Sequence, residues 1–148
     1  MKARFFAALG LAALLVATVM AEDKEVKLDG IKCPVSGKAA TENSVDYKGG
    51  KVYFCCDNCP KAFAKDPAKN AVAANMQLVS TKQAKQEKCP LTGNELNADT
   101  KIKVGEAEVA FCCNNCKGKV EKATGDDQLA LVYADKAFDK GFKVEKAK

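Results

Sequence analysis

Eight cysteines are the residues of this chain whose type and spacing can do chemistry, and they form two groups of four. In each group one cysteine stands alone, and an adjacent pair follows after 21 or 22 residues, with a further cysteine close behind. The groups are Cys33, Cys55, Cys56 and Cys59, and Cys89, Cys112, Cys113 and Cys116. Thiols grouped in this way are typical of a metal site or of a disulfide framework. All eight are candidate ligands to a metal ion.

The two groups belong to an internal repeat. The segment FCCDNC at 54–59 recurs as FCCNNC at 111–116, which is an offset of 57 residues. The leading cysteine, Cys33, recurs as Cys89 with an offset of 56, so the second copy gained one residue in the loop that follows it. Repeats of this kind indicate that one small cysteine module was built twice. Each copy has a thin apolar core at about 55 residues, so the cysteines are expected to hold the fold together.

A β-hairpin is expected between the lone cysteine and the pair in each copy. Apolar and polar residues alternate on both sides of Gly49-Gly50, where two glycines suit a type I′ turn. The second copy keeps the same apolar positions, while its turn becomes residues 105–107. These positions are Val45, Tyr47, Val52 and Phe54, and Ile102, Val104, Val109 and Phe111. The face that the hairpin buries is therefore predicted to be the same in both copies.

A short helix is expected directly after each cysteine cluster, with Asp57 and Asn114 as N-cap residues. Phe63 lies four residues after Cys59 on one face of such a helix, so the helix leads from the thiols into the apolar core. In the first copy Asp66-Pro67 ends this helix, and the proline opens a further turn.

The remaining segments carry shorter patterns. Residues 77–79 and 129–133 are predicted to be short closing strands, and the polar segment 80–88 is predicted to be the linker. The tail, residues 134–148, is predicted to form a short helix packed by Phe138 and Phe142. The chain is thus expected to be an α+β protein with one module at 22–80 and a second module with a C-terminal tail at 81–148.

Residues 1–21 are predicted to be a secretory signal peptide, because Lys2 and Arg4 precede an apolar run that ends at Ala21. Cleavage there leaves 127 residues (148 minus 21) and a net charge of +3 (+5 minus two). Stable membrane insertion is not expected after cleavage. The dispersed lysines and few aromatic residues give no footprint for nucleic acid. Export to the periplasm or the exterior places the thiols in an oxidising space, where they pair or bind metal.

A cysteine knuckle, a hairpin and a helix that begins at further cysteines follow the order of a treble-clef metal finger. Each knuckle has a single cysteine, with Ser36 or Thr92 where a zinc finger has a second one. The fold class is therefore predicted to be two tandem treble-clef-like modules. Thiolates suit soft ions, and a helix N-terminus favours the deprotonated thiol that binding needs.

These residues resemble the YHS domain and its relative, the TRASH domain, over residues 31–67 and more loosely over 88–120. The matching residues are CPVSG at 33–37, YKGGKVYFC at 47–55, Cys59, Phe63 and Asp66-Pro67. The resemblance implies heavy-metal binding by one leading cysteine followed by two cysteines with three residues between them. It assigns this role to Cys33, Cys55 and Cys59, and to Cys89, Cys112 and Cys116. The adjacent thiols, Cys56 and Cys113, are candidates for a fourth ligand in each copy. The chain has no histidine, so a histidine role in the family has no counterpart here.

Three functions are consistent with these features. The first is an exported, non-enzymatic protein that holds Zn²⁺ or Cu⁺ through thiolates in each repeat, as a carrier, a sensor or a structural module. The second is a disulfide-stabilised scaffold for a protein partner. The third is a thiol-disulfide oxidoreductase that uses Cys56 and Cys59, which lacks the surrounding βαβ pattern of a thioredoxin-like site. Hydrolysis by a cysteine nucleophile is disfavoured, because no histidine can serve as its base.

Overall fold

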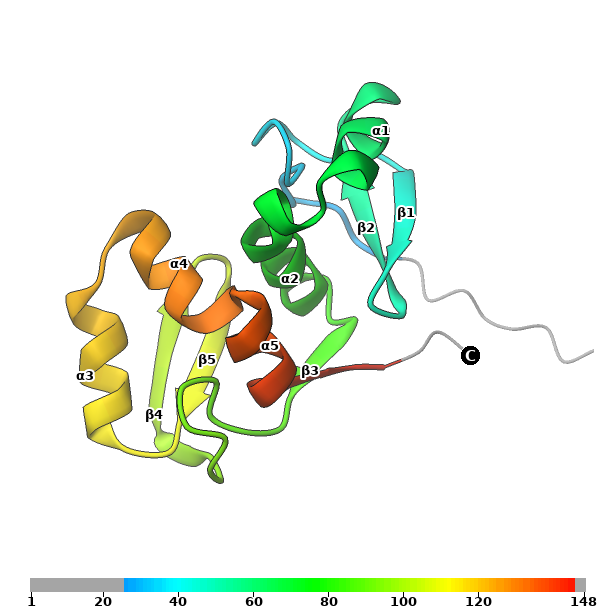
Figure 1. Ribbon diagram of the computed structural model, residues 1–148. Coiled ribbons are helices and arrows are strands. Elements are labelled where there is room, and N and C mark those ends of the chain that lie inside the picture. The colour runs from blue at the N-terminus through cyan, green and yellow to red at the C-terminus, as the bar shows by residue number, and fades with distance from the viewer. Residues whose placement is uncertain (1–25, 146–148) are drawn as a thin grey trace, which may run out of the picture.

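The computed structural model describes residues 26–145 (Figure 1). The predicted signal peptide and its cleavage site lie outside the described residues. The described part of the chain folds into short helices and three two-stranded antiparallel sheets, so the prediction of an α+β protein is confirmed.

The first hairpin consists of β1 (Asn43–Tyr47) and β2 (Gly50–Phe54), with Val45 opposite Val52. Its turn is Lys48-Gly49 and not the predicted Gly49-Gly50, and both turn residues have the positive φ that a type I′ turn requires, 51° and 90°. Gly50 instead opens β2, where an added Cβ would meet the Leu78 side chain at 2.8 Å. The second glycine therefore serves close packing and not the turn.

The second hairpin consists of β4 (Asn97–Val104) and β5 (Ala107–Phe111). Ile102 lies opposite Val109, as Val45 lies opposite Val52, so the predicted register is confirmed. The turn residues between these strands are 105 and 106, and Gly105 has a φ of 61°.

A helix follows each hairpin, as predicted: α1 (Asn58–Lys65) and α3 (Asn114–Lys122). Phe63 and its counterpart Val120 are buried, so both helices lead into the core. Asp57 is the N-cap of α1, although its side chain makes no capping hydrogen bond. The prediction for Asn114 was wrong, because Cys113 adopts the extended conformation of an N-cap residue and Asn114 is already helical.

Both predicted closing strands were wrong. Residues 77–79 lie in α2 (Ala71–Ser80), and residues 129–133 lie in α4 (Gly125–Tyr133). Ala71, Ala74 and Leu78 are buried at helical spacing in α2. A window of three to five apolar residues cannot distinguish a strand from the end of a buried helix. The predicted break at Asp66-Pro67 is confirmed, since a 3₁₀ turn, η1 (Ala68–Asn70), follows it.

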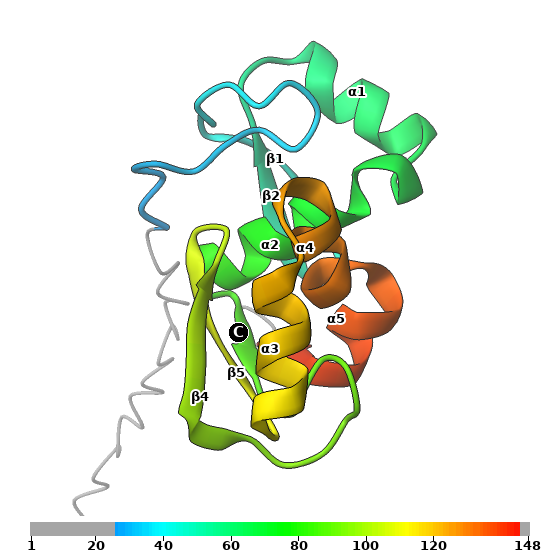
Figure 2. The ribbon, with the colours of Figure 1, turned by 90° about the vertical axis from the view of Figure 1, so that its left-hand side faces the viewer.

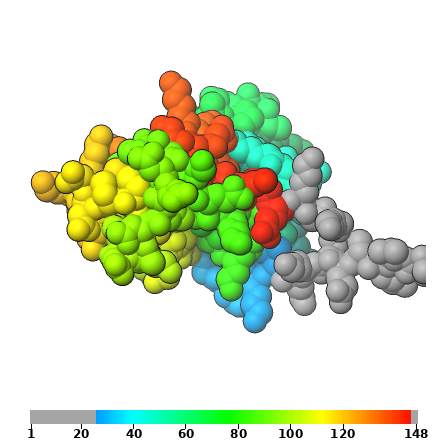
Figure 3. Space-filling view, turned by 90° about the horizontal axis from the view of Figure 1, so that it is seen from below, coloured from blue at the N-terminus to red at the C-terminus, as the bar shows by residue number. Residues whose placement is uncertain are grey.

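The predicted linker 80–88 contains a strand. There β3 (Ala84–Gln86) pairs with β6 (Phe142–Val144) near the C-terminus. The partner strand is too distant in the sequence for a local pattern to show the pairing. The tail also forms the predicted helix, α5 (Asp135–Gly141), and the rings of Phe138 and Phe142 stack with centroids 5.3 Å apart. In the space-filling view the red C-terminal segment lies against the green connecting segment (Figure 3).

The two cysteine modules share one buried core, which includes residues of both hairpins and of α2, α4 and α5. Helices α2 and α4 lie side by side between the hairpins, as Figure 1 and Figure 2 show. At this junction the buried Asn75 amide donates hydrogen bonds to the Tyr133 carbonyl (2.9 Å) and to the Asp135 carboxylate (3.0 Å). Lys48, from the first hairpin turn, also pairs with Asp135 at 3.0 Å. Polar contacts therefore add to the apolar packing between the modules.

Candidate metal centres

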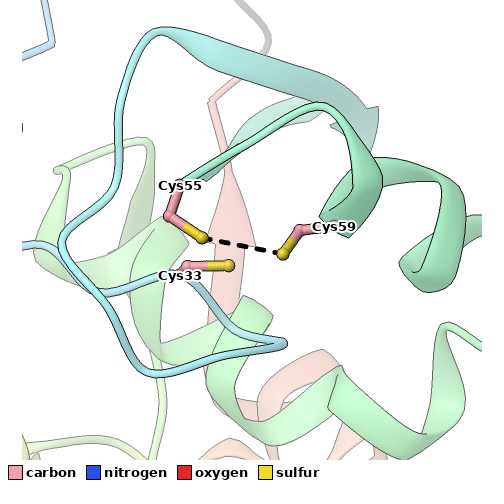
Figure 4. Close-up of side chains that lie close together, drawn as sticks. All are labelled: Cys33, Cys55 and Cys59. Carbon is pink, nitrogen blue, oxygen red and sulfur yellow. Dashed lines mark hydrogen bonds between the residues drawn. The ribbon is translucent and has the colours of Figure 1, made fainter.

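Three sulfur atoms meet in the first module. Cys33 belongs to the knuckle loop at 33–37, Cys55 follows the end of β2, and Cys59 lies in the first turn of α1. The three Sγ atoms all lie within 4.8 Å of one another, and those of Cys55 and Cys59 are 3.6 Å apart. Figure 4 shows the three side chains directed toward a common point. Cys33 and Cys59 are buried, and Cys55 is partly exposed.

The second module repeats this arrangement with Cys89, Cys112 and Cys116. Their Sγ atoms also lie within 4.8 Å of one another, and those of Cys112 and Cys116 are again 3.6 Å apart. The burial is the same, with the partly exposed cysteine after the strand. The structure therefore brings together six of the eight predicted site residues, in two groups of three.

Each knuckle loop is a tight turn closed by backbone hydrogen bonds. The Gly37 N–H donates to the Cys33 carbonyl at 2.9 Å, and the Gly93 N–H donates to the Cys89 carbonyl at 2.7 Å. Both glycines have a positive φ, 69° and 80°, which other residues rarely adopt. This geometry holds the leading cysteine of each group against the other two, and it explains the glycine that ends each knuckle.

The hydroxyl groups of the knuckles contact the sulfurs. Ser36 Oγ lies 3.1 Å from Cys55 Sγ, and Thr92 Oγ1 lies 3.3 Å from Cys112 Sγ. These are the two positions where a four-cysteine finger has another thiol. A hydroxyl at this distance can donate a hydrogen bond to a sulfur, which orients that sulfur within the group.

Hydrogen bonding lowers the pKa of the leading thiol in both groups. Burial raises the pKa of Cys33, but the Ser36 hydroxyl and nearby backbone N–H groups outweigh burial and bring it to about 7. The same balance, with Thr92 supplying the hydroxyl, brings the pKa of Cys89 to about 7. Each group therefore has one thiol that is substantially ionised at neutral pH.

The last thiol of each group shows the opposite behaviour. The hydrogen bond with Cys56, and then burial, raise the pKa of Cys59 to about 12. Burial, and then the hydrogen bond with Cys112, raise the pKa of Cys116 to about 12. Several negative charges within 4.8 Å repel one another, so the thiols share protons unless a cation is present. A cation among the sulfurs would remove this repulsion.

The sulfur separations fit a thiolate-bound ion. Metal-to-sulfur distances of about 2.3 Å place tetrahedral thiolates roughly 3.8 Å apart. The 3.6 Å separations between Cys55 and Cys59 and between Cys112 and Cys116 lie close to this value, and the other pairs lie within 4.8 Å. Both groups can therefore hold a metal ion without a large rearrangement of the chain.

Cys56 and Cys113, the predicted fourth thiols, lie beside the three sulfurs of each group. Both side chains are exposed. Cys56 Sγ lies 3.5 Å from Cys59 Sγ and 3.9 Å from Cys55 Sγ, and Cys113 Sγ lies 3.7 Å from Cys112 Sγ. The backbone N–H of Cys59 is the main cause that lowers the pKa of the Cys56 thiol. These thiols are thus near two separate sites and accessible from solvent.

Gln77, which sequence reasoning missed, joins the two segments that carry Cys33 and Cys55. Its buried side chain accepts a hydrogen bond from the Tyr53 N–H at 2.6 Å and donates to the Tyr53 carbonyl at 2.9 Å. It also donates to the Lys32 carbonyl at 3.0 Å. The Gln77 amide therefore links the backbone of Lys32, which precedes Cys33, to the backbone of β2, which leads to Cys55.

Gln86 makes the corresponding contacts in the second module. It accepts from the Ala110 N–H at 2.9 Å and donates to the Ala110 carbonyl at 2.7 Å and to the Lys88 carbonyl at 3.3 Å. Gln77 lies on helix α2 and Gln86 lies on strand β3, so the two glutamines do not occupy corresponding positions of the repeat. An alignment of the two repeat copies therefore shows no glutamine at matching positions, and it could not identify either residue.

A threonine fixes the peptide in front of the second cysteine in each group. The Thr41 hydroxyl donates to the Phe54 carbonyl at 2.8 Å, and the Thr100 hydroxyl donates to the Phe111 carbonyl at 2.6 Å. These carbonyls belong to the peptides that connect to Cys55 and Cys112. Thus glutamine and threonine side chains together define the path of each strand up to its cysteine.

All eight cysteines lie in the described part of the chain, and all are free thiols. The two three-sulfur groups, within this part, are the places where side chains can hold a metal ion. None of the helices described between residues 26 and 145 has the length and apolar character needed to cross a membrane. In comparisons with known proteins, no family model, no curated protein and no solved structure matches this chain.

Proposed function

We propose that this chain is an exported, non-enzymatic protein that holds one soft metal ion, Zn(II) or Cu(I), in each of its two cysteine groups. The observation that carries this proposal is the convergence of three sulfurs within 4.8 Å, which occurs twice. The knuckles are also duplicated, since each group has a glycine-closed turn and a hydroxyl near the second sulfur. A glutamine joins the segments of each group, although the two glutamines come from different elements.

The donor atoms support a soft ion. Thiolates prefer Cu(I) and Zn(II), whereas Mg(II) and Ca(II) prefer oxygen ligands. The chain has no histidine, and the two groups contain no carboxylate. Cys33, Cys55 and Cys59 would hold the ion in the first module, and Cys89, Cys112 and Cys116 would hold it in the second. A bound ion would supply a cross-link between the knuckle, the strand end and the helix.

The proposal includes the resemblance to YHS and TRASH domains and a tandem pair of treble-clef-like modules. The order of knuckle, hairpin and helix around each group supports it. The two hairpins also share their register. A carrier of metal ions is favoured over a purely structural module, because one sulfur of each group is partly exposed and another thiol stands beside it.

Metal analysis of the protein purified anaerobically from its native compartment tests the proposal. We expect about two soft ions per chain, since each group has its own three thiols. A thiol count on the same sample should find reduced cysteines after the metal is removed. A metal-free chain with all cysteines in disulfides would instead favour the scaffold function, and one ion per chain would indicate a single shared site.

Mass spectrometry of the same sample tests export. The mature chain is expected to begin at Glu22, after removal of residues 1–21. Retention of these residues would contradict both export and the soluble carrier. Assays of disulfide reduction and isomerisation should show no turnover, and catalytic turnover that depends on Cys56 and Cys59 would favour the oxidoreductase.

A further inference from the structure

Cys56 and Cys113 have a position that differs from that of the other six cysteines. Both are exposed, whereas the remaining thiols are buried or partly buried. Neither is one of the three sulfurs that meet at a leading cysteine, which are Cys33, Cys55 and Cys59 in the first module and Cys89, Cys112 and Cys116 in the second. Yet each touches its group, with Cys56 Sγ 3.5 Å from Cys59 Sγ and Cys113 Sγ 3.7 Å from Cys112 Sγ.

The local backbone explains this position. Each of these residues lies between a strand that ends two residues earlier, at Phe54 or Phe111, and a helix that begins one or two residues later, at Asn58 or Asn114. The strand end directs Cys55 or Cys112 toward the leading cysteine, and the first helical turn brings Cys59 or Cys116 to the same point. The intervening cysteine therefore lies at the outer side of the group, beside two of its sulfurs in the first module.

We propose that Cys56 and Cys113 are exchange thiols, through which the ion held by each group passes to a cysteine of a protein acceptor. This inference rests on the proposed function. A fourth sulfur next to an ion with three thiolate ligands can bind it while one of the three dissociates, so the ion keeps three thiolate ligands throughout the exchange. The exposed side chain lets the acceptor thiol approach the same ion.

The exchange conserves atoms and charge. The acceptor thiol loses its proton as its sulfur binds the ion, and the module thiolate that it displaces takes up a proton. One metal–sulfur bond forms and one breaks in each step. No electrons are transferred, so the oxidation state of the ion and of every sulfur stays the same.

Transfer kinetics of the full mature chain test this inference, with Zn(II) as the ion and a dansyl-labelled peptide that carries two cysteines as the acceptor. The variant is Cys56→Ser together with Cys113→Ser. Its matched control is Asn58→Ser together with Asn115→Ser, since these residues are exposed and occupy corresponding positions two residues later. Circular dichroism establishes that both variants are folded.

We expect the cysteine variant to transfer Zn(II) about tenfold more slowly, with a Kd that changes far less than the Kd of Cys55→Ser. The asparagine control should transfer at the rate of the original protein. The single variants should each slow only one of two transfer phases. An unchanged transfer rate would overturn the inference, and so would a loss of affinity equal to that of Cys55→Ser, which would make Cys56 a resident ligand. If the original chain binds no soft ion, the proposed function itself fails.

Discussion

The two cysteine groups have nearly the same sulfur geometry, but different parts of the fold support them. In the first module Gln77 reaches the site from α2, the helix that follows directly in the same module. In the second module Gln86 reaches it from β3, which precedes the knuckle and pairs with the C-terminal strand β6. The two modules therefore share their cysteine positions and hairpin register, while the side chains that support the cysteines come from different elements.

The second knuckle also depends on the C-terminal helix, as the first does not. The N–H groups of Glu87 and Lys88 donate to the Gly141 carbonyl at 2.9 and 3.0 Å. The Lys140 ammonium donates to the Leu91 carbonyl inside the knuckle at 3.1 Å. The second site is therefore coupled to the end of the chain, and the first site to its own following helix. Variants of single residues can separate these supports.

The largest effect is expected from a cysteine within one group. Cys55→Ser should weaken metal binding in the first module more than about 100-fold, because loss of a ligand costs more than the loss of a supporting contact. It should also make the fold of that module metal-independent and less stable. Competition titration of Cys55→Ser should show normal binding in the second module. Cys112→Ser should instead weaken binding in the second module and leave the first unchanged. Loss of both sites in either variant would contradict separate sites.

The adjacent cysteine is the control for this experiment. Cys56→Ser should reduce affinity far less than Cys55→Ser, since Cys56 lies outside the three-sulfur group. Equal losses would show that four thiolates hold the ion, and a larger loss from Cys56→Ser would show that Cys56 replaces Cys55 as the ligand.

Substitutions of Gln77 and Gln86 test whether the two glutamines contribute equally to stability and to metal affinity. Gln77→Leu removes the partners of the Tyr53 N–H and the Lys32 carbonyl and should cost about 1–3 kcal/mol of stability. Gln86→Leu should cost less, because Gln86 is only half-buried and water can replace its amide. Urea unfolding measures the loss of stability in each variant. Metal titration of the folded variants should then show a lower affinity in the module that carries the substitution.

Gln83→Leu is the matched control for Gln77→Leu. The Gln83 side chain accepts a hydrogen bond from the Lys51 N–H and donates one to the Lys51 carbonyl, both at 2.7 Å. Lys51 lies two residues farther from Cys55 along β2 than Tyr53, the residue that Gln77 binds. Gln83→Leu should reduce stability with little change in metal affinity. An equal change in affinity would show that the whole strand edge, and not its end near Cys55, controls the site.

Two helical glycines test the dependence of the second site on the C-terminus. An added Cβ at Gly141 would meet the Pro90 Cα at 2.8 Å and the Lys88 carbonyl at 2.9 Å, so Gly141→Ala should cost about 1–3 kcal/mol by overpacking. It should weaken metal binding in the second module only. Gly118→Ala, in α3 with open space around it, should stabilise the protein by about 0.4–1 kcal/mol. Thermal unfolding measures the change in stability of each variant. If both substitutions stabilised the protein, or both destabilised it, the close packing at Gly141 would not explain the result.

The smallest effect is expected at the ion pairs between the first hairpin turn and α5. Lys48→Met removes contacts with Asp135 and Asp139 at 3.0 and 2.6 Å, and should cost less than about 1 kcal/mol at neutral pH. Neither metal site should change in affinity. A change at one site only would show that the module junction is coupled to that site.

The pH dependence of this variant has a defined sign. Burial raises the pKa of Asp135, but hydrogen bonds from Asn75 and Lys48 and the charge of Lys48 outweigh it, so the pKa lies below its usual value. A carboxylate with a lowered pKa stabilises the fold above about pH 4, and this stabilisation is lost as the pH falls through the lowered value. The difference between the original protein and Lys48→Met should therefore shrink in urea unfolding at acidic pH. A constant difference would contradict the role of Asp135.

Predictions from the sequence were correct where they rested on the internal repeat or on the spacing of residues close together in the chain. The hairpin register followed from alternating residues such as Val45 and Val52, and the helix break followed from Pro67. Prediction failed where the pattern was short or the partner was distant. The last turn of α2, with Leu78 buried, looks like a strand in isolation, and β3 has a partner that lies in the tail.

The sequence by itself determined that the eight cysteines fall into two sets of four, because thiols on a knuckle, at a strand end and at a helix start follow one another at spacings that local geometry requires. It also determined the α+β class. Only the tertiary structure decided that Cys56 and Cys113 stand outside the groups, since their direction depends on how the strand end meets the helix. It also decided the roles of Gln77 and Gln86, because a side-chain amide can satisfy the same backbone groups from a helix or from a strand, and only packing selects which.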